Sequence, residues 1–104
     1  MLRMPQNLTN LPQPKSGLSV LETELRAEQA ATLGRLGHRL QQALERLRAC
    51  PGADTARPAY LTQAAQATWH FFIQRELCGL VDHTQPIEDF HIPNEVLAQV
   101  GAQR

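Results

Sequence analysis

The chain has 104 residues, with ten Lys and Arg against ten Asp and Glu, so its formal net charge is zero. This length provides for one domain, and the zero balance argues against binding nucleic acid or an anionic membrane through bulk charge. No apolar run approaches the ~20 residues of a membrane span, the N-terminus lacks the apolar core of a signal peptide, and two cysteines are too few for a disulfide framework, so we expect a cytoplasmic globular protein.

Residues 1–17 are predicted to form a disordered, proline-rich tail. Three prolines and a glycine fall there among Gln, Asn and Thr, with neither a helical nor a strand period. A single helical domain is predicted over residues 18–101, and residues 102–104 form a second short tail.

The first predicted helix is the longest. Ser19 is a candidate N-cap, and Glu22 three residues later completes a capping box. Leucines then recur at spacings of three and four as far as Leu47, and they fall in one arc when projected at 100° per residue. The sequence Cys50-Pro51-Gly52 ends this helix.

Two glycines, Gly34 and Gly37, lie among small residues on one flank of that helix. Glycine inside a helix costs about 1 kcal/mol relative to alanine. Close packing against another backbone would offset this cost, and we favour that interpretation. The alternative is that the two glycines mark a kink.

The second predicted helix begins with Pro58 at its first position and runs to about Cys78. Gly79 and Leu80 then fit a Schellman ending, in which glycine adopts a left-handed conformation. The helix is apolar on almost every side, with only a narrow strip of Gln and His. Such a pattern is typical of a buried helix.

A chain this small cannot easily surround such a helix with its own residues. We therefore expect a homodimer, in which two long hairpins complete a four-helix bundle. The alternative is a monomer whose short C-terminal helices and N-terminal leucines cover the second helix. The candidate interface consists of Tyr60, Trp69, Phe71, Phe72 and Ile73, together with Gly34 and Gly37.

Two short helices are predicted after the hairpin, each with proline near its first position. The first begins at Thr84-Gln85-Pro86 and runs to Phe90. The second begins at Ile92-Pro93-Asn94-Glu95, runs to Val100 and is closed by Gly101. The predicted fold class is therefore all-α, a long two-helix hairpin plus two short C-terminal helices, completed by dimerisation into a helical bundle.

Arg75 and Glu76 lie inside the apolar arcs of the second helix. Buried charges cost several kcal/mol unless they are paired. We expect Arg75 to pair with Asp82 or Asp89, and Glu76 with an arginine of the first helix. The favoured interpretation is an ion pair that fixes helix or dimer register. The alternative is a ligand-binding or catalytic site formed by Arg75, Glu76, Asp82 and His83.

Other chemistry finds little support in the sequence. Cys78, Asp82, His83 and His91 match no zinc-binding spacing, so we expect no metal ion and no cofactor. Cys78 lies at a helix C-terminus, which is the wrong pole to stabilise a thiolate nucleophile. No phosphate loop, nucleophile elbow or paired-carboxylate signature is present, and we favour a protein that is not an enzyme.

The solvent face of the first helix carries Arg35, Arg39 and Arg46 near its end, while its first half is acidic. Acid at the start and base at the end is the distribution that the helix dipole favours. We interpret this face as solvated, and we do not expect binding of nucleic acid.

Two stretches of the chain are distinctive as strings. They read WHFFIQRELCGL over residues 69–80 and IPNEVLA over residues 92–98. Both resemble a family of short bacterial helical proteins classed as a domain of unknown function, and the likeness covers about residues 18–101. The resemblance implies a small all-helical protein and brings no activity, cofactor or catalytic residue.

These observations lead to one expectation and one alternative. We expect an uncharacterised, non-enzymatic protein that self-associates or binds a protein partner. The alternative is a small-ligand binder or an enzyme with its site around Arg75, Glu76, Asp82 and His83.

Overall fold

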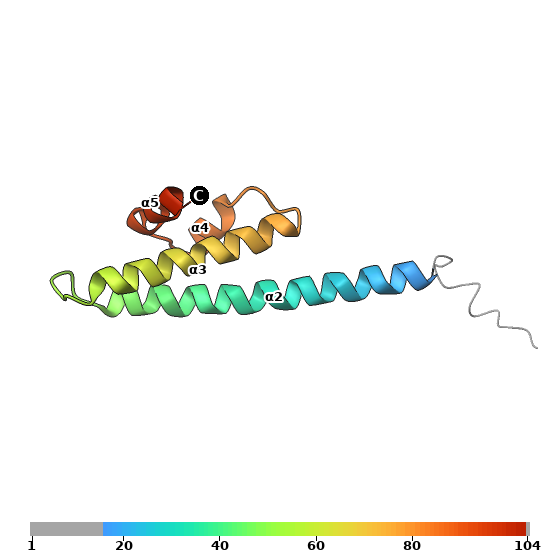
Figure 1. Ribbon diagram of the computed structural model, residues 1–104, viewed down its shortest axis with the longest axis horizontal. Helices are drawn as coiled ribbons and strands as arrows, with labels where there is room; N and C mark the ends of the chain where they lie inside the picture. Colours follow the sequence, from blue (N-terminus) through green and yellow to red (C-terminus); the bar gives the residue numbers. More distant parts are fainter. Residues whose placement is uncertain (1–15, 104) are drawn as a thin grey trace, which may run out of the picture. The chain divides into compact units, whose positions relative to one another are not determined.

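The computed structural model describes residues 16–103 and the side chains of residues 17–102. This part of the chain forms four helices and no strand, which confirms the predicted all-α class (Figure 1). None of the described helices has the length and apolar character of a membrane span. The helices are α2 (Ser16–Ala49), α3 (Arg57–Leu77), α4 (Thr84–Phe90) and α5 (Asn94–Gln103).

The outer ends of the first and last helices differ from the prediction. Helix α2 begins at Ser16, so Ser19 lies within the helix and is not its N-cap. Helix α5 continues past Gly101 to Gln103, because one glycine in a helix costs only about 1 kcal/mol. The rest of the predicted tails, residues 1–15 and 104, lies outside the described residues.

The predicted Schellman ending of α3 is confirmed. Gly79 has φ +89°, and its N–H donates to the carbonyl of Glu76 at 2.9 Å. The N–H of Leu80 donates to the carbonyl of Arg75 at 2.8 Å. These are the two hydrogen bonds of that motif, and they reverse the chain direction at the end of α3.

The chain divides into two compact units. The N-terminal unit ends at Ala31, and its described residues belong to the first part of α2. The side chains of Leu18, Leu21 and Leu25 in this unit are exposed. By sequence spacing they belong to the same arc as the leucines of the second part of α2.

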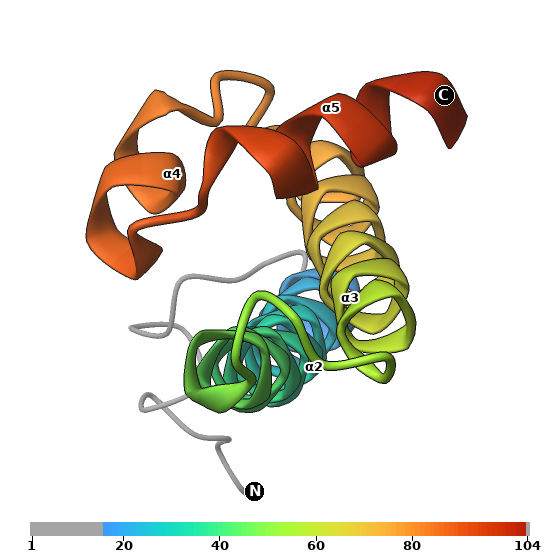
Figure 2. The ribbon, with the colours of Figure 1, turned by 90° about the vertical axis from the view of Figure 1, so that its left-hand side faces the viewer.

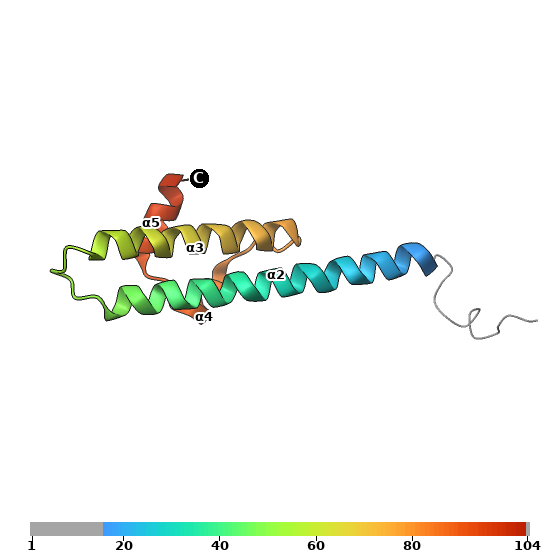
Figure 3. The ribbon, with the colours of Figure 1, turned by 60° about the horizontal axis from the view of Figure 1, so that its bottom comes forward.

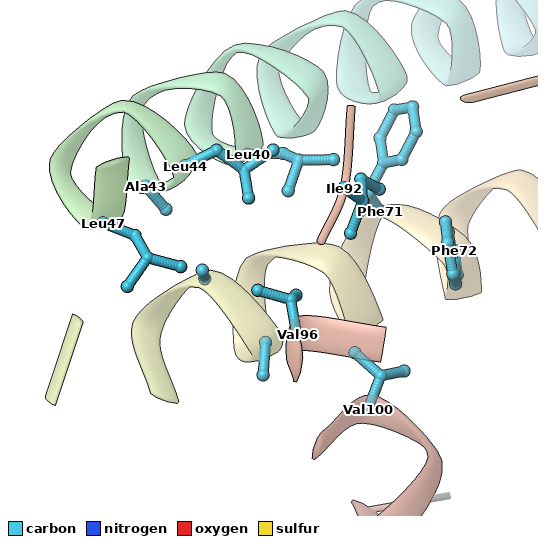
Figure 4. Close-up of a cluster of buried hydrophobic side chains, with 11 residues drawn as sticks. Leu40, Ala43, Leu44, Leu47, Phe71, Phe72, Ile92, Val96 and Val100 are labelled. Atoms are coloured by element: carbon cyan, nitrogen blue, oxygen red, sulfur yellow. The ribbon is translucent and has the colours of Figure 1, made fainter. Parts of the chain in front are cut away.

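The C-terminal unit, residues 32–104, holds the core. Residues 32–49 of α2 and the antiparallel α3 lie side by side, and α5 packs on α3 (Figures 2 and 3). Side chains from all three helices and from the segment before α5 meet between them (Figure 4). The buried apolar residues are Leu40, Ala43, Leu44, Leu47, Ala64, Ala65, Phe71, Phe72, Ile92, Val96 and Val100.

Gly37 is buried in this unit beside two aromatic rings. A Cβ atom at Gly37 would lie 3.3 Å from Cε1 of Phe71 and 3.6 Å from Cζ of Phe90. The two rings contact each other edge to face, with centroids 5.4 Å apart. The close approach expected at this glycine therefore occurs within the chain, and aromatic side chains rather than another backbone supply it.

Arg48 holds the end of α4 against α2. Its Nη2 donates to the carbonyl of Phe90 at 2.6 Å and to the carbonyl of His91 at 3.1 Å. These carbonyls lie at the C-terminal end of the helix, where a cation is favourable. His91 itself has a left-handed conformation, with φ 55°, and the N–H of Ile92 donates across it to the carbonyl of Ile87 at 3.0 Å.

A bidentate ion pair joins the starts of α3 and α5. Nη1 of Arg57 lies 3.0 Å from Oε1 of Glu95, and Nη2 lies 2.6 Å from Oε2. The hydrogen bonds from Arg57 lower the pKa of Glu95 below its ordinary value. Glu95 lies in the first turn of α5, so the helix dipole favours the same charged form.

Candidate functional site

The turn after α3 brings together the four polar residues singled out in the sequence. Nε of Arg75 donates to Nδ1 of His83 at 3.1 Å, and Nη2 of Arg75 donates to the carbonyl of Asp82 at 2.8 Å. Nε2 of His83 lies 2.9 Å from Oε2 of Glu76. The His83 ring stacks in parallel on Phe72 with centroids 4.1 Å apart. We call Phe72, Arg75, Glu76, Asp82 and His83 the His83 cluster.

The local backbone explains why these residues converge. The Schellman turn folds residues 80–83 back toward the last turn of α3, so that His83 reaches both Arg75 and Glu76, eight and seven residues earlier. The turn also fixes the carbonyl of Asp82 in front of Arg75. The Schellman turn and the position of His83 in the sequence thus bring the side chains of the cluster together.

The carboxylate partners predicted for Arg75 were wrong. The carboxylate of Asp82 does not bond Arg75; its Oδ1 accepts hydrogen bonds from the N–H of Thr84 at 3.0 Å and from the Thr84 hydroxyl at 2.8 Å. These bonds, the backbone one first, lower the pKa of Asp82. Asp89 accepts a hydrogen bond from Gln85 instead. Glu76 contacts His83.

The donors fix the tautomer of His83. Nε of Arg75 can only donate, so Nδ1 of His83 accepts, and Nε2 carries the proton and donates to Glu76. Both ring nitrogens are thus engaged, and the side chain is only 12% exposed. A histidine in this state has no free lone pair with which to abstract a proton or bind a metal ion. The arrangement fixes the turn on the end of α3.

Metal binding has no geometric basis in the part of the chain that the structure describes. No three side chains of His, Cys, Asp or Glu come together there in a way that could hold an ion. Cys78 accepts a weak hydrogen bond from Gln74, 3.8 Å from its sulfur.

The predicted interface residues fall into two groups. Phe71, Phe72 and Gly37 are buried in the C-terminal unit, so a second copy cannot contact them while this core is intact. The reason is that α5 packs on α3 and supplies Val96 and Val100 to the core. The remaining residues are more accessible: Tyr60, Trp69 and Ile73 are half-buried, and Gly34 is exposed with open space around its Cα.

Sequence reasoning missed three exposed leucines in the first part of α2. Leu18, Leu21 and Leu25 in α2 are 63%, 62% and 58% exposed, although Leu21 and Leu25 were interpreted as part of one continuous core arc. The predicted lengths of the two long helices could have indicated that these leucines are exposed. At 1.5 Å per residue, α3 with 21 residues is about 30 Å long and α2 with 34 residues about 50 Å, so α3 cannot cover the whole arc.

Comparison with known proteins gives a family. The model of a family of unknown function (DUF6665) matches residues 1–104. The chain belongs to this family. Membership confirms the resemblance to an uncharacterised domain, and it supplies no activity. No curated protein and no solved structure matches the chain, so the function of this family member must be argued from its own residues.

Proposed function

We propose that this family member is a small, non-enzymatic, cytoplasmic interaction module that works by self-association. The observation that carries the proposal is the exposure of Leu18, Leu21 and Leu25, each about 60% accessible. We call these three residues the leucine ridge. Their spacing of three and four places them within one arc of about 60° at 100° per residue.

The ridge has the pattern of a packing surface. Apolar residues at alternating spacings of three and four are what helices use to pack against other helices. Single exposed apolar residues are common and need no explanation, but three leucines on one face of one helix form a contiguous strip. Covering such a strip removes it from water, which favours association.

The expected strength of association is modest. In a symmetric dimer the complete burial of six leucines, three from each copy, contributes a favourable free energy of about 10 kcal/mol. The loss of translational and rotational freedom on association costs roughly 4–15 kcal/mol. The net free energy then corresponds to a dissociation constant of micromolar or weaker. We therefore expect a dimer that forms and dissociates with concentration.

The His83 cluster supports a non-enzymatic protein. Each ring nitrogen of His83 bonds a neighbouring side chain, and the Asp82 carboxylate is bonded to Thr84. The alternative, a ligand site or enzyme at these residues, is favoured by their convergence at one place. It would require a ligand to displace at least one of these bonds.

Light scattering with matched variants tests the proposal. The full chain is expected to gain mass toward twice the monomer as its concentration rises. The variant Leu21→Ser/Leu25→Ser is expected to stay monomeric, because it removes two of the three ridge side chains. Val20→Ser is the control, since Val20 is also exposed, at 54%, but lies on another face of α2. A monomeric wild-type chain at every concentration, or a ridge variant that associates like the wild type, would contradict the proposal.

A further inference from the structure

The charges of α2 are segregated along its length. Residues 17–31 contain three Glu and one Arg, whereas residues 32–49 contain four Arg and one Glu. The helix dipole accounts for Arg46 and Arg48, which lie in the last turn, but the first turn of α2 contains no acidic residue. Since the dipole acts only within the first and last turns, it does not explain the glutamates of the second to fourth turns or the arginines in the middle.

Some of these charges lie along one edge of the helix. At 100° per residue, Glu24, Arg35 and Arg39 fall within an arc of about 60°, and all three are exposed. The same projection places this edge directly beside the leucine ridge, on the side of Leu21. A partner that covers the ridge therefore also meets this charged edge.

A second copy of the chain has the complementary charges in an antiparallel arrangement. A two-fold axis perpendicular to two antiparallel helices brings the same edge of each helix to the same side, and two-fold dimers are the commonest oligomers. The acidic half of one α2 then faces the basic half of the other. A parallel two-fold arrangement would instead put the charged edges of the two copies on opposite sides of the interface, so that the acidic half of one α2 would not face the basic half of the other.

On this basis, which rests on the self-association proposed above, we propose that two copies pair antiparallel, with Glu24 of each copy opposite Arg39 of the other. In this register Leu25 lies within about 3 Å, along the helix axis, of the level of Leu36 in the other copy. Leu36 is half-buried, and the aliphatic stems of arginines also cover apolar surface. The ridge of one copy thus packs on the basic part of α2 in the other, not on the other ridge.

Pairing of ridge with ridge is disfavoured by charge. It would place the glutamates of residues 22–28 of both copies close together, and like charges across an interface oppose association. The same charges that argue against that register favour the proposed one.

Reversing one charge at a time tests the pairing in the full chain. Glu24→Arg and Arg39→Glu each turn both symmetry-related contacts into like-charge contacts, so each variant alone is expected to dimerise about tenfold more weakly than the wild type. In an equimolar mixture of the two variants, both contacts of the mixed dimer again join opposite charges. Sedimentation velocity of the mixture is therefore expected to return the wild-type dissociation constant.

The controls separate this inference from the self-association itself. Glu45→Arg changes an exposed charge on another face of α2 and is expected to dimerise like the wild type. All the replaced side chains are exposed, so circular dichroism is expected to give wild-type helicity for each variant. A mixture as weak as its components, or single variants that dimerise like the wild type, would overturn the antiparallel pairing. If the ridge variant is monomeric in that case, the self-association proposal still stands, whereas a monomeric wild type removes both.

Discussion

Replacing His83 by alanine removes three interactions at the end of α3. The hydrogen bonds to Arg75 and Glu76 each involve a charged partner and are worth about 1.5–3 kcal/mol when buried. Glu76 is 30% exposed on its side chain, so solvent screening reduces its bond toward the lower end or below. The stack on Phe72 adds about 0.5–1.5 kcal/mol. We expect a net loss of about 2 kcal/mol, because water satisfies part of what Arg75 and Glu76 lose.

Thermal unfolding followed by circular dichroism at neutral pH measures this loss. For a domain of this size, about 2 kcal/mol corresponds to a fall in Tm of roughly 10 °C. His83→Phe keeps a ring on Phe72 and removes only the hydrogen bonds, so it is expected to lose less than His83→Ala. His70→Ala is the control, because His70 is exposed on α3. A Tm for His83→Ala equal to that of the control would refute a structural role for the cluster.

Two further predictions concern the ends of α4 and α5. His91→Gly is expected to stabilise the protein by about 0.5–1 kcal/mol in urea unfolding, because His91 has φ 55° and glycine adopts this conformation without strain; a lower urea midpoint would contradict this. Arg57 lowers the pKa of Glu95, so this pair stabilises the fold above the ordinary glutamate pKa, and the stabilisation is lost as the pH falls through the lowered value. Glu95→Gln is therefore expected to flatten the acid side of the stability–pH curve, and an unchanged curve would show that the pair contributes nothing.

The helices themselves could be predicted from the sequence because their signals are local. The 3.6-residue period gave the two long helices, and proline near the first position marked the two short ones. The Schellman ending followed from Gly79 alone, since few residues other than glycine adopt a positive φ without cost. At the outer ends of α2 and α5 the local signals were misleading: the capping box of Ser19 and Glu22 and the glycine at 101 both lie inside the helices.

The partners of the cluster could not be predicted in the same way. Spacing placed Asp82 within reach of Arg75, but it did not show which group of Asp82 would face the guanidinium. The carboxylate bonds Thr84, two residues further on, because local hydrogen bonds of Asp to following backbone groups compete well with longer contacts. Arg75 instead donates to the backbone carbonyl of Asp82. The position of this carbonyl depends on the backbone conformation of the turn, which the spacing of residues does not give.

A helical projection also could not predict which element covers an apolar face. The projection identified Phe71 and Phe72 as apolar, yet it could not distinguish a second copy from α5 as the element that buries them. Val96 and Val100 in the last helix pack into that core. The leucine ridge was missed for the same reason. A helical projection shows which residues share a face, but not how far along α2 the shorter α3 extends.

The weight-average mass of the full wild-type chain, measured by light scattering from about 1 μM to about 1 mM, tests the central claim most directly. Self-association through the leucine ridge predicts a mass that rises with concentration from that of one chain toward that of two. A mass that stays at one chain over the whole range would contradict the account.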